Sequence, residues 1–186
     1  MNQIEIKVSV CCITYNHAPF LKKCLDGFLL QQTSFPIEVI IHDDASTDGT
    51  QKIIEEYTSK HPDIFFPLLQ KENQYRKGIR GMNAKFNFPR CTGKYIALCE
   101  GDDFWNDPHK LQKQVDFLEE ENIAENCSNS PGKKREIPSL ILQDFIRLFT
   151  YEKILSRLSM KSTGSRPLSE VLLSEFLPYD DKWIDD

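Results

Sequence analysis

The sequence lacks several features that would place it in a well-known class of protein. It has no run of about 18 apolar residues, and no long apolar stretch follows its charged first residues, so neither a membrane span nor a signal peptide is predicted. It has no C-x-x-C pair and no His/Cys cluster with zinc spacing, so we expect its six cysteines to be reduced and mostly buried. These absences predict an intracellular globular protein that works in the cytoplasm.

The glycine-rich nucleotide-binding loops of common α/β enzymes are also missing. No G-x-G-x-x-G follows the first apolar run and no G-x-x-x-x-G-K-S/T is present, which disfavours a dinucleotide oxidoreductase and a P-loop NTPase. The loop 14–20 contains no glycine, which disfavours a nucleotidyltransferase. A receiver domain would carry its acid pair after the first strand, whereas here the pair follows the second.

Basic residues are too few for a general nucleic-acid binder, since the formal net charge is −5, and we expect no nucleic-acid partner. One segment reverses this balance, and we call it the basic stretch (residues 71–94). It contains seven basic residues and a single acid, Glu72. An anionic ligand such as a diphosphate would explain the basic stretch, and a solvated charged loop is the competing interpretation.

Short apolar runs alternate with helical patterns along the first two thirds of the chain. The runs are rich in β-branched residues and too short for helices, which predicts buried strands. These four strands lie at 6–14, 37–41, 64–69 and 95–99. Apolar residues at three- and four-residue spacing predict helices at 19–32, after residue 50 and after Pro108. The alternation predicts an α/β fold with a mainly parallel sheet flanked by helices.

The last third of the chain has a different character. Residues 122–137 are rich in turn formers, a helical pattern returns at 138–160, and a shorter helical candidate lies around 168–176. The chain is therefore divided into a domain at 1–121 and an atypical, mostly helical C-terminal segment at 122–186.

Three polar loops follow predicted strands. They lie at 15–17, 43–48 and 100–103. Ligands of parallel sheets bind beyond the carboxyl ends of the strands, so we expect these loops to converge on one crevice. Adjacent acids such as Asp43 and Asp44 repel each other unless a cation or hydrogen bonds compensate, and helix capping is the competing interpretation of this pair.

Glu100, Asp102 and Asp103 place three acids in four residues at the end of a strand, with a glycine that lets a ligand approach the backbone. Carboxylate oxygens suit a hard divalent cation, Mn²⁺ or Mg²⁺, shared with substrate phosphates. A metal with a diphosphate would also give the basic stretch a partner. His17 and His42 lie near the same crevice by chain position, and we interpret both as structural histidines.

Three motifs follow one another along the chain. They are VSVCCITYN at 8–16, IIHDDASTDGT at 40–50 and GKYIALCEGDDFW at 93–105. In this order and at these separations they resemble the family-2 inverting glycosyltransferases of the GT-A fold. The resemblance covers about residues 4–121 and implies a Rossmann-like, nucleotide-sugar-binding GT-A domain there.

The resemblance implies a role for each matched residue. Thr14 and Tyr15 line the nucleobase pocket, with the Tyr15 ring against the base, and Asp44 hydrogen-bonds to the base. Packing at the loop is the competing interpretation of Tyr15. Asp102 matches the metal-binding acid that ends the family's D-x-D motif, whereas Glu100 replaces the first acid of that motif.

Three further residues complete the predicted site. Asp103 supports the metal, Mn²⁺ or Mg²⁺, from outside its ligand shell. Arg80 and Arg90 of the basic stretch are our candidates for the diphosphate, because a planar guanidinium group can bind phosphate at two points.

The reaction implied by the resemblance is a direct displacement. An acceptor hydroxyl, deprotonated by a general base, attacks the anomeric carbon while the metal neutralises the leaving nucleoside diphosphate. The base is unassigned; Asp180 and Asp181 resemble the family's acidic pair before a tryptophan, and a solvated acidic tail is the competing interpretation.

We expect a UDP-sugar donor, a glycan or lipid-linked acceptor, a role in cell-surface polysaccharide synthesis, and peripheral contact with the inner face of the membrane. The alternative is a nucleotide-sugar-binding module or degenerate transferase without turnover.

Overall fold

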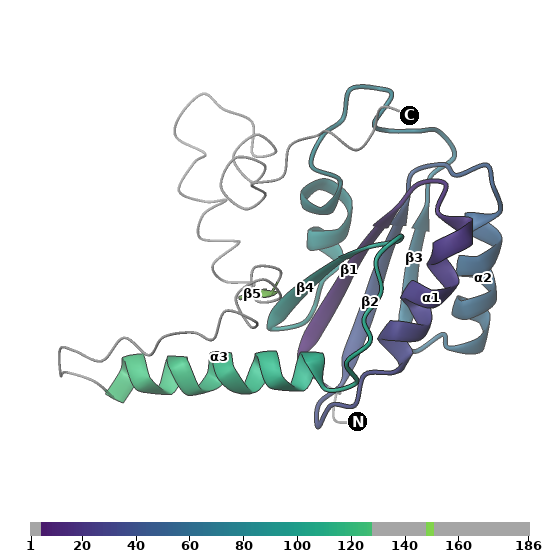
Figure 1. The fold of residues 1–186 in the computed structure, drawn as a ribbon. Coiled ribbons are helices and arrows are strands. Elements are labelled where there is room, and N and C mark those ends of the chain that lie inside the picture. The colour runs from purple at the N-terminus through teal and green to yellow at the C-terminus, as the bar shows by residue number, and fades with distance from the viewer. Residues whose placement is uncertain (1–4, 128–147, 151–186) are drawn as a thin grey trace, which may run out of the picture.

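A computed structural model describes residues 5–127 and 148–150 of the 186-residue chain. Its centre is a five-stranded sheet with the strand order β3-β2-β1-β4-β5 (Figure 1). The strands are β1 (Val8–Thr14), β2 (Ile37–Asp43), β3 (Phe65–Leu69), β4 (Tyr95–Glu100) and β5 (Leu148–Thr150). The first four run parallel to one another, and β5 pairs antiparallel with β4. The four predicted strands and their parallel arrangement are confirmed.

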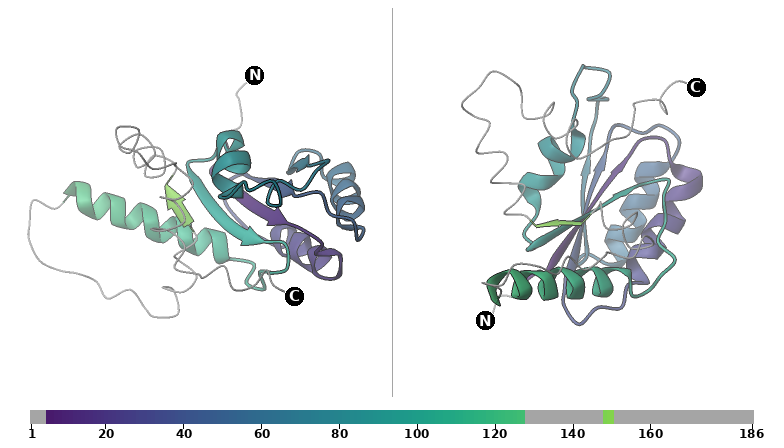
Figure 2. Two further views of the ribbon diagram at one scale, coloured as in Figure 1. Left: turned by 90° about the horizontal axis from the view of Figure 1, so that it is seen from above. Right: turned by 60° about the vertical axis from the view of Figure 1, so that its left-hand side comes forward.

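Helices cover one face of the sheet, and the basic stretch covers the other (Figure 2). The helices are α1 (Ala18–Leu29), α2 (Thr50–Lys60) and α3 (Lys110–Cys127). The basic stretch contains a π-helical turn, η1 (Asn83–Asn87), and a 3₁₀ turn, η2 (Phe88–Arg90). This layered α/β architecture is the predicted Rossmann-like one. None of the described helices is both long and apolar enough to span a bilayer.

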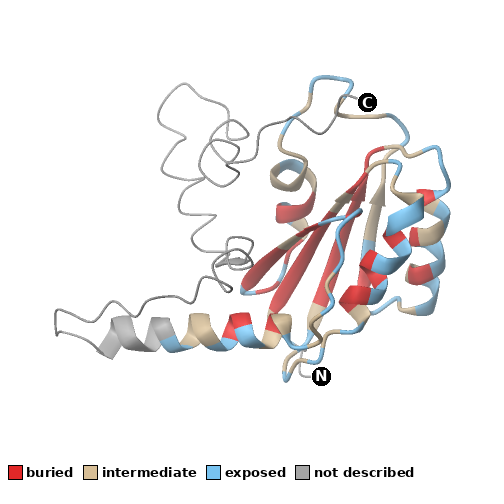
Figure 3. Cartoon of the chain, viewed as in Figure 1, coloured by how far each residue is buried: buried red, intermediate tan, exposed pale blue. Residues whose placement is uncertain are grey.

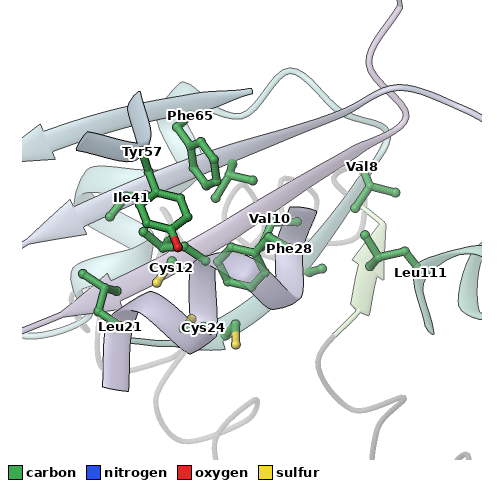
Figure 4. Packing of buried hydrophobic residues seen from close by; sticks show 14 of the residues in the cluster. Val8, Val10, Cys12, Leu21, Cys24, Phe28, Ile41, Tyr57, Phe65 and Leu111 are labelled. Carbon is green, nitrogen blue, oxygen red and sulfur yellow. The ribbon is translucent and has the colours of Figure 1, made fainter. Parts of the chain in front are cut away.

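Alternate residues of the strands face two separate hydrophobic clusters. The larger cluster lies between the sheet and the three helices and includes Val10 and Phe28 (Figure 4). The smaller cluster joins Cys11 of β1 to Phe88 and Cys91 of the basic stretch. Because both faces are packed, the central strands are buried almost throughout (Figure 3), which explains why they are continuous apolar runs in the sequence.

The cysteines whose side chains the structure describes are buried and free, as the sequence predicts. They are Cys11, Cys12, Cys24, Cys91 and Cys99. Burial raises the pKa of the Cys11 thiol well above its usual range. A thiol in this state is protonated at neutral pH and serves as a small apolar group in the core.

A buried carboxylate joins β2 to the segment that leads into β4. Glu38 Oε1 accepts hydrogen bonds from Ser9 Oγ at 2.6 Å, from Thr92 N at 2.7 Å and from Thr92 Oγ1 at 3.0 Å. Ser9 Oγ in turn accepts a hydrogen bond from Gly93 N at 2.9 Å. A Cβ atom at Gly93 would lie 2.6 Å from the Ser9 nitrogen, so only glycine permits this close approach. The network satisfies a charge inside an apolar layer.

Two expectations for the last third of the chain are wrong where the structure describes it. Strand β5 lies inside the segment 138–160 that was predicted to be helical, and α3 continues to Cys127, into the predicted turn-rich segment 122–137. Pairing with β5 satisfies backbone groups along the edge of β4, and this tertiary contact overrides a local helical pattern. The helical candidate at 168–176 lies outside the described residues, and the domain boundary at residue 121 stays a prediction.

Removing the Glu38 carboxylate should destabilise the domain. Glu38→Ala leaves the Ser9 hydroxyl and the Thr92 amide without their acceptor, so we expect the free energy of unfolding in urea to fall by about 2–4 kcal/mol. Glu55→Ala truncates an exposed glutamate on α2 and is the matched control, with an expected change below about 0.5 kcal/mol. Equal losses in the two variants would contradict the role of Glu38.

Candidate active site at the carboxyl edge of the sheet

The parallel register brings three strand-end loops to one edge of the sheet. Thr14 at the end of β1 lies opposite Asp43 at the end of β2. On the other side of β1, Ile13 lies opposite Glu100 at the end of β4. The predicted convergence of these loops is therefore confirmed, at the edge where parallel sheets bind their ligands.

Hydrogen bonds join the loop after β1 to the loop after β2. Asn16 N donates to Ser46 Oγ at 2.8 Å, and Thr47 N donates to Asn16 Oδ1 at 2.8 Å. Ala18 N, at the start of α1, donates to Asp48 Oδ2 at 2.9 Å. Asn16 has a φ of 54°, a left-handed conformation that asparagine adopts more readily than most residues. Sequence reasoning missed this connection. The signal available in the sequence is an asparagine, Asn16, two residues before α1 begins at Ala18.

The first acid of the pair, Asp43 at the end of β2, stabilises its own loop through hydrogen bonds. The fully buried Asp43 carboxylate accepts hydrogen bonds from Ser46 N at 3.0 Å, from Gln51 Nε2 at 2.6 Å and from the Ser46 hydroxyl. These bonds compensate its charge. The N-cap of α2 is Gly49, and Asp48 directly before it accepts a hydrogen bond at Oδ1 from Thr50 N, the first amide of the helix, at 3.0 Å. Asp48, and neither acid of the pair, is therefore the carboxylate bonded to the first amide of α2.

The second acid holds the start of the basic stretch at the same edge. Asp44 Oδ1 accepts a hydrogen bond from Gln74 N at 2.7 Å, and Oδ2 accepts one from Tyr75 N at 3.0 Å. Asn73 Nδ2 donates to the Asp44 carbonyl at 3.0 Å, and Asp44 N donates to the Thr14 carbonyl at 3.0 Å. Asp44 is buried, and these bonds take part of the roughly four acceptor positions that a carboxylate offers.

Thr14 lies between Asp44 and the loop after β4, and Tyr15 follows it in the chain. Thr14 is buried, and its Oγ1 has no hydrogen-bond partner among the described residues. Tyr15 is half-buried. A buried hydroxyl without a partner is uncommon in a folded protein and indicates either strain or a missing ligand. The assignment of both residues to a nucleobase pocket stays a prediction.

Glu100, Asp102 and Asp103 form an exposed acidic turn after β4. Gly101 N donates to the Ile13 carbonyl at 2.9 Å and holds the turn against the end of β1. In the described part of the chain, no three carboxylate, imidazole or thiol groups gather closely enough to hold a metal ion by themselves. Mn²⁺ and Mg²⁺ commonly take one or two carboxylates and complete their coordination with phosphate and water oxygens, so the turn fits such an ion. The metal assignment stays a prediction.

Gly101 has a packing role that sequence reasoning missed, since it was explained by ligand approach alone. A Cβ atom at this position would lie 2.6 Å from Thr14 Oγ1 and 3.0 Å from His17 Nδ1. Any larger residue would therefore push the acidic turn away from β1. The glycine sets the distance between the acidic turn and the loop after β1.

The two arginines predicted to bind a diphosphate have different surroundings. Arg80 is exposed, its guanidinium group lies 3.8 Å from the centre of the Tyr75 ring, and its Nη1 donates to the Tyr75 carbonyl at 2.9 Å. Arg90 is half-buried, its Nη2 donates to the Phe66 carbonyl at 2.7 Å, and burial lowers its pKa. Arg80 thus belongs to the turn that Asp44 holds, whereas Arg90 contacts β3. Both assignments stay predictions.

His42, expected to be a structural histidine, lies on the face of the sheet that the basic stretch covers. His42 is buried, and its ring stacks on Phe86 with the ring centroids 4.6 Å apart. Burial lowers the pKa of His42, so the imidazole is neutral at pH 7, as suits the structural role we expected. Asp180 and Asp181 lie outside the described residues.

Comparison with known proteins assigns the chain to a family. The sequence-family model described as Glycosyl transferase family 2 matches residues 9–168 of this chain. The chain therefore belongs to glycosyl transferase family 2. The match continues past residue 121, where we predicted a domain boundary.

Similar sequences come from several bacteria. An uncharacterized protein of Mycobacterium tuberculosis is 46% identical over 114 residues, covering 60% of this chain and 31% of that protein. Chondroitin synthase of Escherichia coli is 35% identical over 161 residues, covering 77% of this chain and 22% of that enzyme. The Escherichia coli glucosyltransferase WfaP is 32% identical over 123 residues, covering 66% of this chain and 45% of that enzyme. This chain spans less than half the length of each.

Solved structures share the fold. Staphylococcus aureus TarS in complex with UDP matches with a TM-score of 0.58 and 19% identity, over 82% of this chain and 49% of that one. The mannosyltransferase PcManGT from Pyrobaculum calidifontis, in complex with GDP-Man and Mn²⁺, matches with a TM-score of 0.55 and 23% identity, over 87% of this chain and 48% of that one. The fold is the GT-A fold that the motifs predicted.

Removing the Asp44 carboxylate should release the turn at the start of the basic stretch. Asp44→Ala deprives the Gln74 and Tyr75 amides of a charged acceptor, and such bonds contribute about 1.5–3 kcal/mol each. We expect hydrogen exchange at these two amides to accelerate at least about tenfold, measured by NMR or mass spectrometry. Exchange of the Val10 amide, inside β1, serves as the control and should not change. Unchanged exchange at Gln74 and Tyr75 would contradict the role of Asp44.

Proposed function

We propose that this chain binds a nucleoside-diphosphate sugar at the carboxyl edge of its sheet and transfers the sugar, with inversion, to a hydroxyl group of an acceptor. The observation that carries this proposal is that two acid-bearing loops flank the end of β1. Asp44 N donates to the Thr14 carbonyl, and Gly101 N, directly before Asp102, donates to the Ile13 carbonyl. Membership of glycosyl transferase family 2 supports the same class of reaction.

The nucleobase binds beside Asp44 in this proposal. The base imide N–H donates to an acceptor position of the Asp44 carboxylate that Gln74 and Tyr75 leave available. The Tyr15 ring packs against the base, and the unpartnered Thr14 hydroxyl gains a polar partner. A UDP-sugar is the favoured donor, supported by the structures of TarS in complex with UDP and in complex with UDP-GlcNAc.

The diphosphate binds beside the acidic turn. Asp102, with Glu100 and Asp103 beside it, would hold Mn²⁺ or Mg²⁺, whose chemistry is to neutralise the charge of the departing diphosphate. These residues contribute hard oxygen donors at a turn that Gly101 holds against β1. The presence of Mn²⁺ with GDP-Man in the PcManGT complex supports this choice of ion.

The proposed reaction is a single displacement. The acceptor hydroxyl oxygen forms a bond to the anomeric carbon, the bond from that carbon to the diphosphate oxygen breaks, and the electron pair leaves with the diphosphate. The hydroxyl proton passes to a general base, for which Asp180 and Asp181 remain the candidates. Attack from the face opposite the leaving group inverts the anomeric configuration.

The acceptor is a glycan or a lipid-linked glycan in this proposal. Support comes from relatives named for teichuronic acid biosynthesis, for chondroitin synthesis and for transfer to a diphosphoundecaprenol-linked sugar. A lipid-linked acceptor would bring the protein to the inner face of the membrane from the cytoplasm. The proposed setting is the synthesis of cell-surface polysaccharide.

Calorimetry and a turnover assay test the proposed function and the metal site together. We expect the parent to bind UDP in the presence of Mn²⁺ and to release UDP from a UDP-sugar only when an acceptor is added. Asp102→Asn removes a ligand charge at an exposed position, so it should weaken Mn²⁺-dependent UDP binding at least about tenfold without unfolding the chain. Asp63→Asn, at an exposed loop position, is the matched control.

The outcomes separate three cases. Binding without acceptor-dependent turnover would favour a nucleotide-sugar-binding module or degenerate transferase over an active enzyme. Absence of nucleotide binding would contradict the proposed function. Asp102→Asn with the affinity of the parent would show that the metal lies elsewhere.

Arg80 and Arg90 can be distinguished by comparing ligands with and without phosphate. We expect Arg80→Ala to weaken binding of UDP by about 1.5–3 kcal/mol and binding of uridine much less, because only UDP carries the anion. The difference should persist at raised salt, which screens long-range attraction but not a direct contact. Arg90→Ala removes hydrogen bonds to the sheet, so a fall in thermal stability would accompany any effect on UDP. Equal losses for UDP and uridine would remove either arginine from the diphosphate site.

A further inference from the structure

We propose that His17 is a positioning residue for the Asp102 carboxylate, an inference that rests on the proposed function of the acidic turn. The imidazole Nδ1 of His17 lies 3.8 Å from Asp102 Oδ1. This separation is longer than a hydrogen bond, which needs about 2.7–3.2 Å, and a rotation of the exposed carboxylate would close it. The two residues come from different loops, after β1 and after β4.

The Nδ1 atom of His17 needs a partner that the rest of the described structure does not supply. It is buried and has no hydrogen-bond partner among the described residues, although a quarter of the side chain is exposed. A buried polar atom left in this state is costly and therefore uncommon. Asp102 carries an acceptor that faces this atom, so a bond between them would satisfy the imidazole.

The placement of His17 is rigid. Its carbonyl accepts hydrogen bonds from Phe20 N at 3.0 Å and from Leu21 N at 2.9 Å, which fixes its backbone at the first turn of α1. On the other side, Gly101 packs so closely that a Cβ atom there would lie 3.0 Å from Nδ1. Asp102 directly follows Gly101, so the acidic turn delivers its carboxylate to a fixed imidazole.

A hydrogen bond from Nδ1–H to Oδ1 would orient the carboxylate and leave its Oδ2 to face a metal ion. Residues that hold a ligand in place in this way commonly contribute about 10–100-fold to metal affinity. We expect a large effect of His17 on metal affinity, because no three metal-binding side chains gather among the described residues. With few protein ligands, the orientation of each carboxylate has a large share in holding the ion. From the sequence we interpreted His17 as structural. Its proximity to Asp102, which is distant in the sequence, is known only from the folded structure.

The first test uses the metal-free full chain and asks which imidazole nitrogen of His17 carries the proton. In a neutral imidazole the tautomer is set by the hydrogen bond that each nitrogen makes. Nitrogen-15 NMR should show the Nδ1–H form of His17 in the parent and a shift towards the Nε2–H form in Asp102→Ala. His17→Ala identifies the signal among the four histidines.

This test does not depend on nucleotide binding. A parent with the proton of His17 on Nε2, or a tautomer that Asp102→Ala leaves unchanged, would overturn the inference even if the proposed function were correct. Conversely, a parent that shows the Nδ1–H form and yet binds neither UDP nor Mn²⁺ would contradict the proposed function and leave the His17–Asp102 bond established.

The second test measures Mn²⁺ affinity of the UDP-bound chain by electron paramagnetic resonance of free Mn²⁺. We expect His17→Ala to weaken Mn²⁺ about tenfold while UDP affinity in EDTA stays unchanged. His17→Asn can place an amide N–H near the Nδ1 position and should recover affinity to within about threefold of the parent, whereas His17→Gln reaches the Nε2 position and should not. His109→Ala, an exposed histidine before α3, is the control and should match the parent.

Two outcomes of the second test would overturn the inference. Unchanged Mn²⁺ affinity in His17→Ala would show that the imidazole does not act on the metal site. Equal weakening in His17→Ala and His17→Asn would show that His17 serves the packing of the loops and not the orientation of Asp102.

Discussion

The register of the parallel strands β1, β2 and β4 is the constraint on which the candidate site depends. Because Thr14 lies opposite Asp43 and Ile13 lies opposite Glu100, each strand-end loop begins at a fixed level. A slip of one residue would exchange the two faces of a strand, and both faces are packed here, so the register is strongly specified. The positions of the acids that follow these strands are a consequence of the core.

The adjacent acids Asp43 and Asp44 hold different segments of the chain because successive residues at the end of a strand point to opposite faces. Asp43 points towards the helical side, where Gln51 of α2 and the backbone of its own loop compensate its charge. Asp44 points towards the basic stretch and holds the backbone of Gln74 and Tyr75. The first acid bonds its own loop to α2, and the second, which is also buried, bonds that loop to the basic stretch.

The basic stretch combines two tasks that its charge alone would not suggest. Phe88 and Cys91 bury the second face of the sheet, and Arg90 donates to a backbone carbonyl of β3. Arg80 stays exposed in the turn held by Asp44. The segment that covers the second face of the sheet also carries exposed cations. It therefore brings positive charge to the carboxyl edge of the sheet, where the acidic turn also lies.

The sequence by itself determined the alternation of strands and helices, the parallel sheet and the loops that meet at its edge, because these follow from local periodicity and from strand direction. Only the tertiary structure decided which groups satisfy one another. Asp44 bonds to Gln74, 30 residues away, and Glu38 to Thr92, 54 residues away. The packing also brings His17 Nδ1 to 3.8 Å from Asp102 Oδ1, although the two residues lie in different loops. Such partners depend on how distant segments pack, and no periodicity along the chain records that packing.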